Sequence, residues 1–131
     1  MENPKIKEGL QIRKAVLGEE AINKMMAEAD EFSRPFQELL NEYCWGTVWA
    51  RPGLPRKVRS LLNLAMLTAL NRPQEVRTHI RGALRNGCTK EEIMEVFLQT
   101  AIYCGVAAAN DSFRVAKEFF AGSEKNAPPR K

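Results

Sequence analysis

The stretch from residue 58 to residue 87, VRSLLNLAMLTALNRPQEVRTHIRGALRNG, decides the fold because it encodes two helices and the turn between them. Its first half is apolar on more than one side, which is typical of a central, buried helix. Asn71 and Arg72 form a tight connector, and Pro73 suits the first position of the second helix. Gly87 is a typical C-terminal stop. The stretch therefore predicts a helical hairpin near the centre of the protein.

The sequence on both sides of the hairpin is also helical in pattern. Apolar spacing predicts helices over residues 6–17 and 19–31, and a third from an N-cap at Ser33 to about residue 45, before an irregular stretch at 46–54. Thr89 and Glu92 form a capping box that opens another helix, and a last helix follows Gly105. We therefore predict an all-α, single-domain bundle of about six or seven helices over residues 1–121, with a flexible tail at 122–131.

Length and composition narrow the class of protein. The 131 residues fit one domain, and 44% hydrophobic and 27% charged residues indicate a globular chain rather than a fibrous or disordered one. Three cysteines without a CxxC pattern and a single histidine, His79, argue against a disulfide framework and against a metal site with two histidine ligands. No signal peptide and no apolar run of membrane length is apparent, so we expect a cytoplasmic protein with no membrane partner.

The net charge of +4 is concentrated in one segment. Residues 51–90 carry nine Lys and Arg residues and a single acid, Glu75, whereas the segments on either side are acidic overall. A basic segment of this kind suits nucleic acid or a small polyanionic substrate. Residues 61–70 and 96–109 are apolar beyond one helical stripe, which favours a subunit interface and hence a homo-oligomer.

The hairpin at 58–87, the capping segment TKEEIMEV at 89–96 and YCGV at 103–106 resemble the carboxymuconolactone decarboxylase family, which shares its fold with the alkylhydroperoxidase D-like proteins. FSRPFQELLNEYCWG at 32–46, followed by RPGL at 51–54, is similar to the decarboxylase branch of that family. The resemblance covers roughly residues 8–120. It implies an all-α homo-oligomer, a trimer or hexamer, that uses no cofactor and no metal. It also implies decarboxylation of 4-carboxymuconolactone to 3-oxoadipate enol-lactone in protocatechuate catabolism.

The peroxidase branch of the same fold carries a CxxC motif whose second cysteine lies four residues before its motif histidine. Counted back from His79, the two cysteine positions hold Arg72 and Glu75. A thiol peroxidase needs a nucleophilic thiolate and a resolving thiol. We therefore expect no peroxidase activity of this kind.

The implied decarboxylation needs cationic groups for two carboxylates, a donor at the developing enolate oxygen and an acid that protonates carbon. His79, at the position of the family's motif histidine, is the first candidate for the acid or the enolate donor. Glu75, four residues earlier, either orients His79 and raises its pKa or acts as the acid itself. Glu42 is a second candidate acid. The alternatives are a structural histidine and an ordinary surface pair.

Three arginines are predicted carboxylate anchors. Arg51 lies in the irregular loop, Arg59 enters the apolar central helix, and Arg72 takes a position that carries chemistry in the peroxidase branch. Trp45 is predicted to wall the pocket and exclude water, with core packing as its alternative. Cys44 is predicted to line the pocket as a small apolar residue and not as a nucleophile.

Two other functions remain open from the residues alone. One is a related decarboxylase or isomerase acting on another lactone or keto acid. The other is a small nucleic-acid-binding protein that uses Arg77, Arg81 and Arg85, which recur every four residues; a steep salt dependence of binding would indicate it. We expect no nucleic-acid partner, because no reading helix with interleaved polar and aromatic contacts is evident in the sequence. Otherwise this arginine stripe is expected to be solvated or to contact another subunit.

Overall fold

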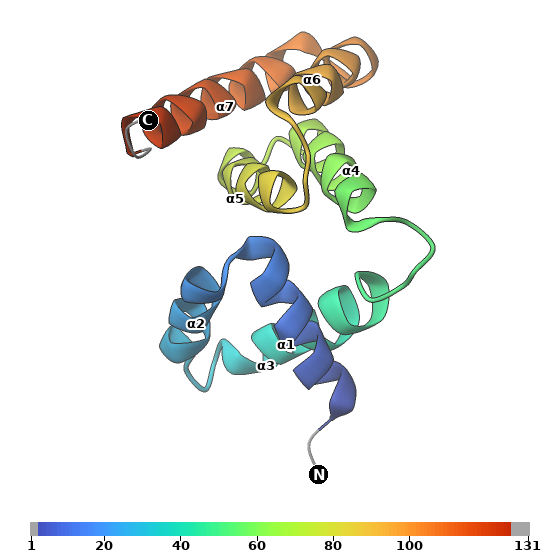
Figure 1. Cartoon of the computed structure of the whole chain (residues 1–131), viewed down its shortest axis with the longest axis vertical. Helices are drawn as coiled ribbons and strands as arrows, with labels where there is room; N and C mark the ends of the chain where they lie inside the picture. Colours follow the sequence, from blue (N-terminus) through green and yellow to red (C-terminus); the bar gives the residue numbers. More distant parts are fainter. Residues whose placement is uncertain (1–2, 127–131) are drawn as a thin grey trace, which may run out of the picture. The chain divides into compact units, whose positions relative to one another are not determined.

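The computed structural model describes residues 3–126, with side chains through residue 122, and within this range it contains helices and turns but no strand. This confirms the predicted all-α fold. The elements are seven α-helices and a π-helical segment, η1 (Figure 1). In chain order they are α1 (Pro4–Leu17), α2 (Glu19–Glu28), α3 (Arg34–Leu39), η1 (Leu40–Val48), α4 (Arg56–Ala69), α5 (Pro73–Arg85), α6 (Lys90–Cys104) and α7 (Val106–Asn126).

The expected single domain consists of two compact units, divided between Arg59 and Ser60. The division falls in the first turn of α4, so most of α4 belongs to the second unit. We call the units the N-terminal unit and the C-terminal unit. No helix in the described range is long and apolar enough to cross a membrane.

The N-terminal unit is built around the close approach of α1 and η1. Gly9 and Gly46 form this contact: a Cβ added at Gly9 would overlap the carbonyl oxygen of Asn41 and lie 2.6 Å from the backbone nitrogen of Gly46. Only glycine fits at such a backbone-to-backbone contact. The neighbouring core holds Ile12, Val16, Leu17, Ile22, Trp45 and Trp49.

The C-terminal unit contains the predicted hairpin, α4 and α5, with α6 and α7 running side by side against it (Figure 1). Its core comprises Leu64, Val76, Ile80, Ala83, Cys88, Ile93, Phe97 and Ala116. The Phe97 and Phe113 rings meet edge to face with centroids 5.6 Å apart. A buried hydrogen bond of 2.8 Å between the hydroxyls of Thr68 and Ser112 ties α4 to α7.

Local signals placed most helix ends correctly. The capping box is confirmed: the Glu92 backbone nitrogen donates to Thr89 Oγ1, and the Thr89 nitrogen donates to Glu92 Oε1. Gly18, Gly87 and Gly105 all have positive φ at helix ends. Ser33 occupies the N-cap position of α3, but its Oγ accepts a hydrogen bond from the Asp30 nitrogen instead of capping the helix.

Two helix ends differ from the predicted ones. The helix expected to stop near residue 45 continues in π-helical form to Val48. The last helix continues to Asn126, so residues 122–126 are helical where we expect the tail to begin. Glu124 and Lys125 are good helix formers, which explains the continuation. The rest of the expected tail, residues 127–131, lies outside the described range.

Candidate active site

His79 lies on α5, half-buried, and faces α4. Its Nδ1 is 3.4 Å from the amide nitrogen Nδ2 of Asn63. Burial lowers the pKa of His79 below its ordinary value of 6.5, and the charge of Arg81 lowers it further, whereas Glu75 acts in the opposite direction. The upward effect expected of Glu75 is therefore present, but burial and Arg81 outweigh it and the net shift is downward.

The contact with Asn63 suits one of the two neutral tautomers of His79. In that tautomer the Asn63 amide NH2 donates, Nδ1 accepts and Nε2 carries the hydrogen. With its pKa below 6.5, the ring is mostly neutral near pH 7. His79 is therefore arranged as a neutral hydrogen-bond donor through Nε2–H.

Glu75 and Arg72 are exposed at the start of α5. Glu75 stands in the first turn of the helix, where the helix dipole favours a carboxylate. Arg72 occupies the N-cap position, and its backbone nitrogen donates to the Leu67 carbonyl at 3.0 Å. The structure thus brings Arg72, Glu75 and His79 onto one short segment, with Asn63 as an added neighbour of His79.

Arg51 and Arg59 are brought together in the N-terminal unit. Arg59 Nη2 donates to the Arg51 backbone carbonyl at 3.2 Å. The Arg59 Nε is buried and has no hydrogen-bond partner among the described residues. The Arg51 side chain is exposed in the loop after η1. Two guanidinium groups therefore flank one loop, and one of them retains an unused donor.

Glu42, Cys44 and Trp45 all lie on η1. Glu42 is half-buried, and its Oε1 accepts a hydrogen bond of 2.9 Å from Asn3 Nδ2. Burial raises the pKa of the half-buried Cys44 thiol, against a smaller opposite effect of Arg13, so the thiol stays protonated and is a poor nucleophile. This agrees with the expectation that Cys44 is not a nucleophile.

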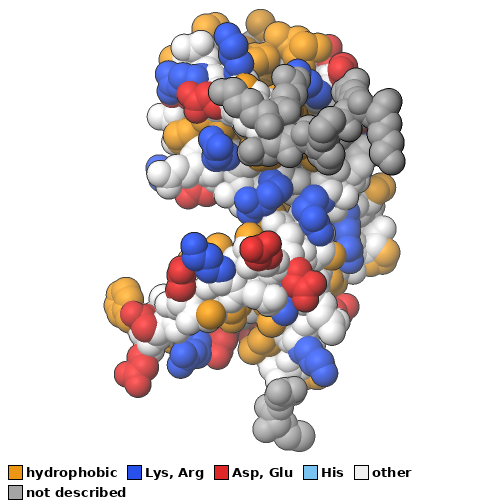
Figure 2. Space-filling model, turned by 60° about the vertical axis from the view of Figure 1, so that its left-hand side comes forward, with side chains coloured by type: hydrophobic (Ala, Val, Ile, Leu, Met, Phe, Trp, Pro, Cys, Tyr) orange, Lys and Arg blue, Asp and Glu red, His pale blue; other side chains and the backbone are white. Residues whose placement is uncertain are grey.

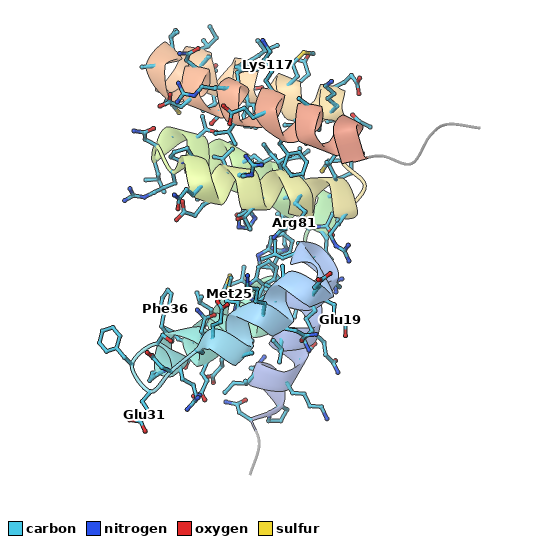
Figure 3. The ribbon with its side chains drawn as sticks, turned by 90° about the vertical axis from the view of Figure 1, so that its left-hand side faces the viewer. Glu19, Met25, Glu31, Phe36, Arg81 and Lys117 are labelled. Carbon is cyan, nitrogen blue, oxygen red and sulfur yellow. The ribbon has the colours of Figure 1, made fainter. Side chains whose placement is uncertain are left out.

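Trp45 is 4% exposed and stacks on Trp49 with ring centroids 4.7 Å apart. Both rings belong to the core of the N-terminal unit. Core packing, the alternative considered for Trp45, is therefore what the structure shows within this unit. The arginine stripe on α5 is exposed as expected: Arg77, Arg81 and Arg85 all reach solvent, and Arg81 can be seen on α5 in Figure 3.

Sequence reasoning missed Arg13, a buried arginine on α1 that is 4% exposed. Its Nη1 donates to Gln37 Oε1 at 2.8 Å and to Asn41 Oδ1 at 3.0 Å, and its Nη2 lies 3.0 Å from the sulfur of Met25. The signal was present, because Arg13 lies among the apolar face positions of its helix. Arg13 joins α1 to α3 and η1 and so holds the segment that carries Glu42.

Asn63 was also missed, since nothing in an isolated asparagine on an apolar helix identifies its partner. Within residues 3–126 no three His, Cys, Asp or Glu side chains are grouped as a metal site would require. The candidate residues thus form two groups, each described within its own unit. One is the Asn63–His79 pair with Arg72 and Glu75, and the other is Arg51 and Arg59 with the residues of η1.

Comparison with known proteins places the chain in a family. Residues 34–118 match the model of the carboxymuconolactone decarboxylase family. The chain is 42% identical over 114 residues to 4-carboxymuconolactone decarboxylase of Acinetobacter baylyi, covering 87% of this chain and 85% of the relative. It is 44% identical over 111 residues to nitrosuccinic acid decarboxylase npaB of Metarhizium robertsii, covering 85% and 78%. On this evidence of sequence similarity across both units, the protein belongs to the carboxymuconolactone decarboxylase family.

Proposed function

We propose that this protein decarboxylates 4-carboxymuconolactone to 3-oxoadipate enol-lactone in protocatechuate catabolism. The observation that carries the proposal is the 42% identity to an enzyme of that name across 87% of the chain. The grouped arginines and the His79–Asn63 pair supply the kinds of group that this reaction requires. The free thiols of Cys44 and Cys104 fit a reducing compartment, and we propose the cytoplasm.

The reaction places modest demands on the protein. As the C–C bond to the carboxylate breaks, its electron pair moves through the conjugated C=C bond onto the lactone carbonyl, which becomes an enolate oxygen, and CO2 leaves. A proton then adds to carbon. Because the substrate accepts its own electrons, we propose that no cofactor takes part. The protein has to hold the carboxylates, stabilise the enolate oxygen and deliver the proton.

We assign these roles to named residues. Arg51, Arg59 and Arg72 anchor carboxylates, a task that suits the guanidinium fork. Neutral His79 donates from Nε2 to the developing enolate oxygen, which its lowered pKa and its contact with Asn63 support. Glu75 and Glu42 are the candidate proton donors to carbon. Cys44 is proposed to line the substrate site, and Trp45 to support that site from the core of the N-terminal unit.

The first experiment follows loss of the enzymatically generated lactone and release of CO2 by the full chain, without added metal or cofactor. Arg51→Gln and Arg59→Gln should each raise KM by about tenfold, because each removes a charge-assisted contact. Arg77→Gln is the matched control, since it removes the same charge from an exposed position on α5. Absence of turnover by folded protein refutes the function, and equal KM values for all three variants refute the anchoring roles.

The second experiment tests the role of His79 through its neighbour. Asn63→Asp places a carboxylate beside Nδ1, which raises the pKa of His79 and favours a proton on Nδ1. If the neutral ring is the donor, the acid limb of the kcat/KM profile moves to higher pH. Asn63→Leu, which removes the contact without adding charge, should not raise that limb. An Asn63→Asp enzyme that gains activity at high pH with an unmoved acid limb would instead identify cationic His79 as the acid.

A second candidate substrate is nitrosuccinic acid, which the relative from Metarhizium robertsii decarboxylates according to its name. Its 44% identity to this chain favours this candidate about as well as the first. A nitro group, like the lactone carbonyl, accepts an electron pair from a carboxylate lost at the adjacent carbon. Comparing kcat/KM for the two compounds on one preparation decides between them.

We also propose that the protein is a homo-oligomer, a trimer or hexamer, that covers two apolar stripes of the C-terminal unit. Hydrophobic side chains reach the surface of both units (Figure 2). In the C-terminal unit they recur every four residues: Leu62 and Met66 on α4, Leu70 in the turn directly after it, and Leu98 and Ile102 on α6. Ile102 is 81% exposed. Light scattering should give an oligomer mass for the wild type and a smaller one for Ile102→Lys, whereas Lys24→Glu should leave the mass unchanged.

A further inference from the structure

The C-terminal unit contains a pocket that none of the candidate site residues lines. It has a volume of about 450 Å³ and lies between the start of α6 and the second half of α7. Its inner wall is apolar: Ile93 and Phe97 are fully buried, and the ring of Phe113 meets Phe97 edge to face. A pocket of this size accommodates a small organic ligand, and its aromatic edges suit a flat ring.

The rim of the pocket is positively charged. Lys90 and Lys117 both line it, with Glu91 as the acid beside them. The Lys90 ammonium lies 5.0 Å from the centroid of the Phe120 ring, which holds it at the rim by a cation–π contact. Lys117 projects from the exposed side of α7 (Figure 3). In the described part of the chain no ion pair neutralises either ammonium group.

We propose that this pocket binds an aromatic monocarboxylate. The ring occupies the apolar interior beside Phe97 and Phe113, and the carboxylate reaches the two lysines at the rim. Lys90 is also the first residue of the fifteen-residue α6, so the positive end of the helix dipole reinforces the attraction for an anion there. The two lysines outnumber Glu91, so the rim carries a net positive charge that favours a ligand with one negative charge on an apolar body.

Titration calorimetry with 2-naphthoate tests the proposal, with 2-naphthalenemethanol as the uncharged analogue of similar shape. The acid should bind the wild type at one site per chain, and the alcohol about tenfold more weakly. Lys117→Gln should weaken binding of the acid by a similar factor while leaving binding of the alcohol unchanged. Lys24→Gln, on α2 of the N-terminal unit, is the matched control and should bind like the wild type.

The same titration separates this pocket from the candidate active site. His79→Gln should bind 2-naphthoate like the wild type, whatever its effect on decarboxylation. Loss of binding in His79→Gln, or equal binding by wild type and Lys117→Gln, overturns the proposal. The proposal is also overturned if 2-naphthoate does not bind the wild type and Lys117→Gln gives a smaller oligomer mass. That pair of results would show that a second copy of the chain occupies the pocket.

Discussion

Gly9→Ala is expected to destabilise the N-terminal unit because it adds a methyl group where two backbones touch. The new Cβ would overlap the Asn41 carbonyl oxygen and stand 2.6 Å from the Gly46 nitrogen, although real Cβ contacts essentially never fall below 3.0 Å. Both obstacles are backbone atoms, so no side-chain rotation relieves them. The helices α1 and η1 must move apart, and that movement opens the core around Ile12 and Val16.

The magnitude follows from two opposing effects. Overpacking against rigid neighbours costs about 3 kcal/mol or more, the upper end of the usual range. Alanine in place of glycine in a helix returns about 1 kcal/mol through helix propensity. The net loss in the free energy of unfolding is therefore about 2 kcal/mol or more. Gly122→Ala is the matched control: Gly122 lies inside α7, nothing is within 4 Å of its added Cβ, and the propensity gain acts alone.

Urea unfolding monitored by tryptophan fluorescence reports on the correct unit, because both tryptophans, Trp45 and Trp49, belong to the N-terminal core. Far-UV circular dichroism reports on both units. Gly9→Ala should shift the fluorescence transition to lower urea, whereas Gly122→Ala should shift only the dichroism transition, to higher urea. A fluorescence transition of Gly9→Ala within about 0.5 kcal/mol of the wild type would refute the close contact between α1 and η1.

Three further predictions follow from the described side chains. Because burial lowers the pKa of His79 in the folded state, its contribution to stability is present above about pH 6.5 and is lost as pH falls through the lowered value. Urea unfolding near pH 7 and pH 5 should therefore show a smaller decrease in the free energy of unfolding for His79→Gln than for the wild type. An equal decrease would contradict this. A thiol reagent near pH 8 should modify exposed Cys104 before Cys44, whose pKa burial raises; equal rates would be inconsistent with that burial. Thr89→Ala should lower the free energy of unfolding by about 1 kcal/mol, because it removes the oxygen that accepts a hydrogen bond from the Glu92 backbone nitrogen. Urea unfolding followed by circular dichroism measures this change, and a decrease under about 0.3 kcal/mol would contradict a stabilising cap.

The helices were predictable where local chemistry decides them. Thr89 and Glu92 satisfy the free N–H groups at the start of α6 without help from any other element. Gly18, Gly87 and Gly105 adopt positive φ, which other residues rarely do, so their places in the sequence mark helix ends directly. Each of these signals acts within a few residues, and apolar periodicity fills the intervals between them.

The π-helical segment was not predictable because contacts from another helix accompany it. Its register, with bonds reaching five residues back, is seen where the Trp49 nitrogen donates to the Cys44 carbonyl at 2.9 Å. The buried Asn41 side chain receives Arg13 from α1, and Gly46 lies against the Lys5 carbonyl. Arg13 and Lys5 both lie on α1, outside the segment, so the periodicity of the segment alone gives an ordinary helix.

In the candidate site, the sequence identifies the types of residue, whereas their roles depend on contacts that form only in the folded chain. The sequence singles out His79 because it is the one histidine in the chain and occupies the position of the family's motif histidine. The direction of its pKa depends on burial and on the charge of Arg81, and its hydrogen-bond partner is Asn63, a neutral residue sixteen positions earlier in the sequence. A neighbouring carboxylate was visible in the sequence, whereas the desolvation that outweighs it exists only after folding.

A lowered pKa at His79 has a catalytic consequence if the proposed reaction is correct. A cationic arginine attracts the carboxylate that the substrate keeps to a similar degree in the bound substrate and in the transition state, so its loss should appear mainly in KM. A neutral donor attracts a ground-state carbonyl weakly and an enolate oxygen strongly, so its loss should appear mainly in kcat. A permanently charged His79 would also attract the substrate's carboxylates before the reaction, and so would stabilise the bound substrate as well as the transition state. The burial that lowers the pKa of His79 thus favours the interaction that strengthens as CO2 departs.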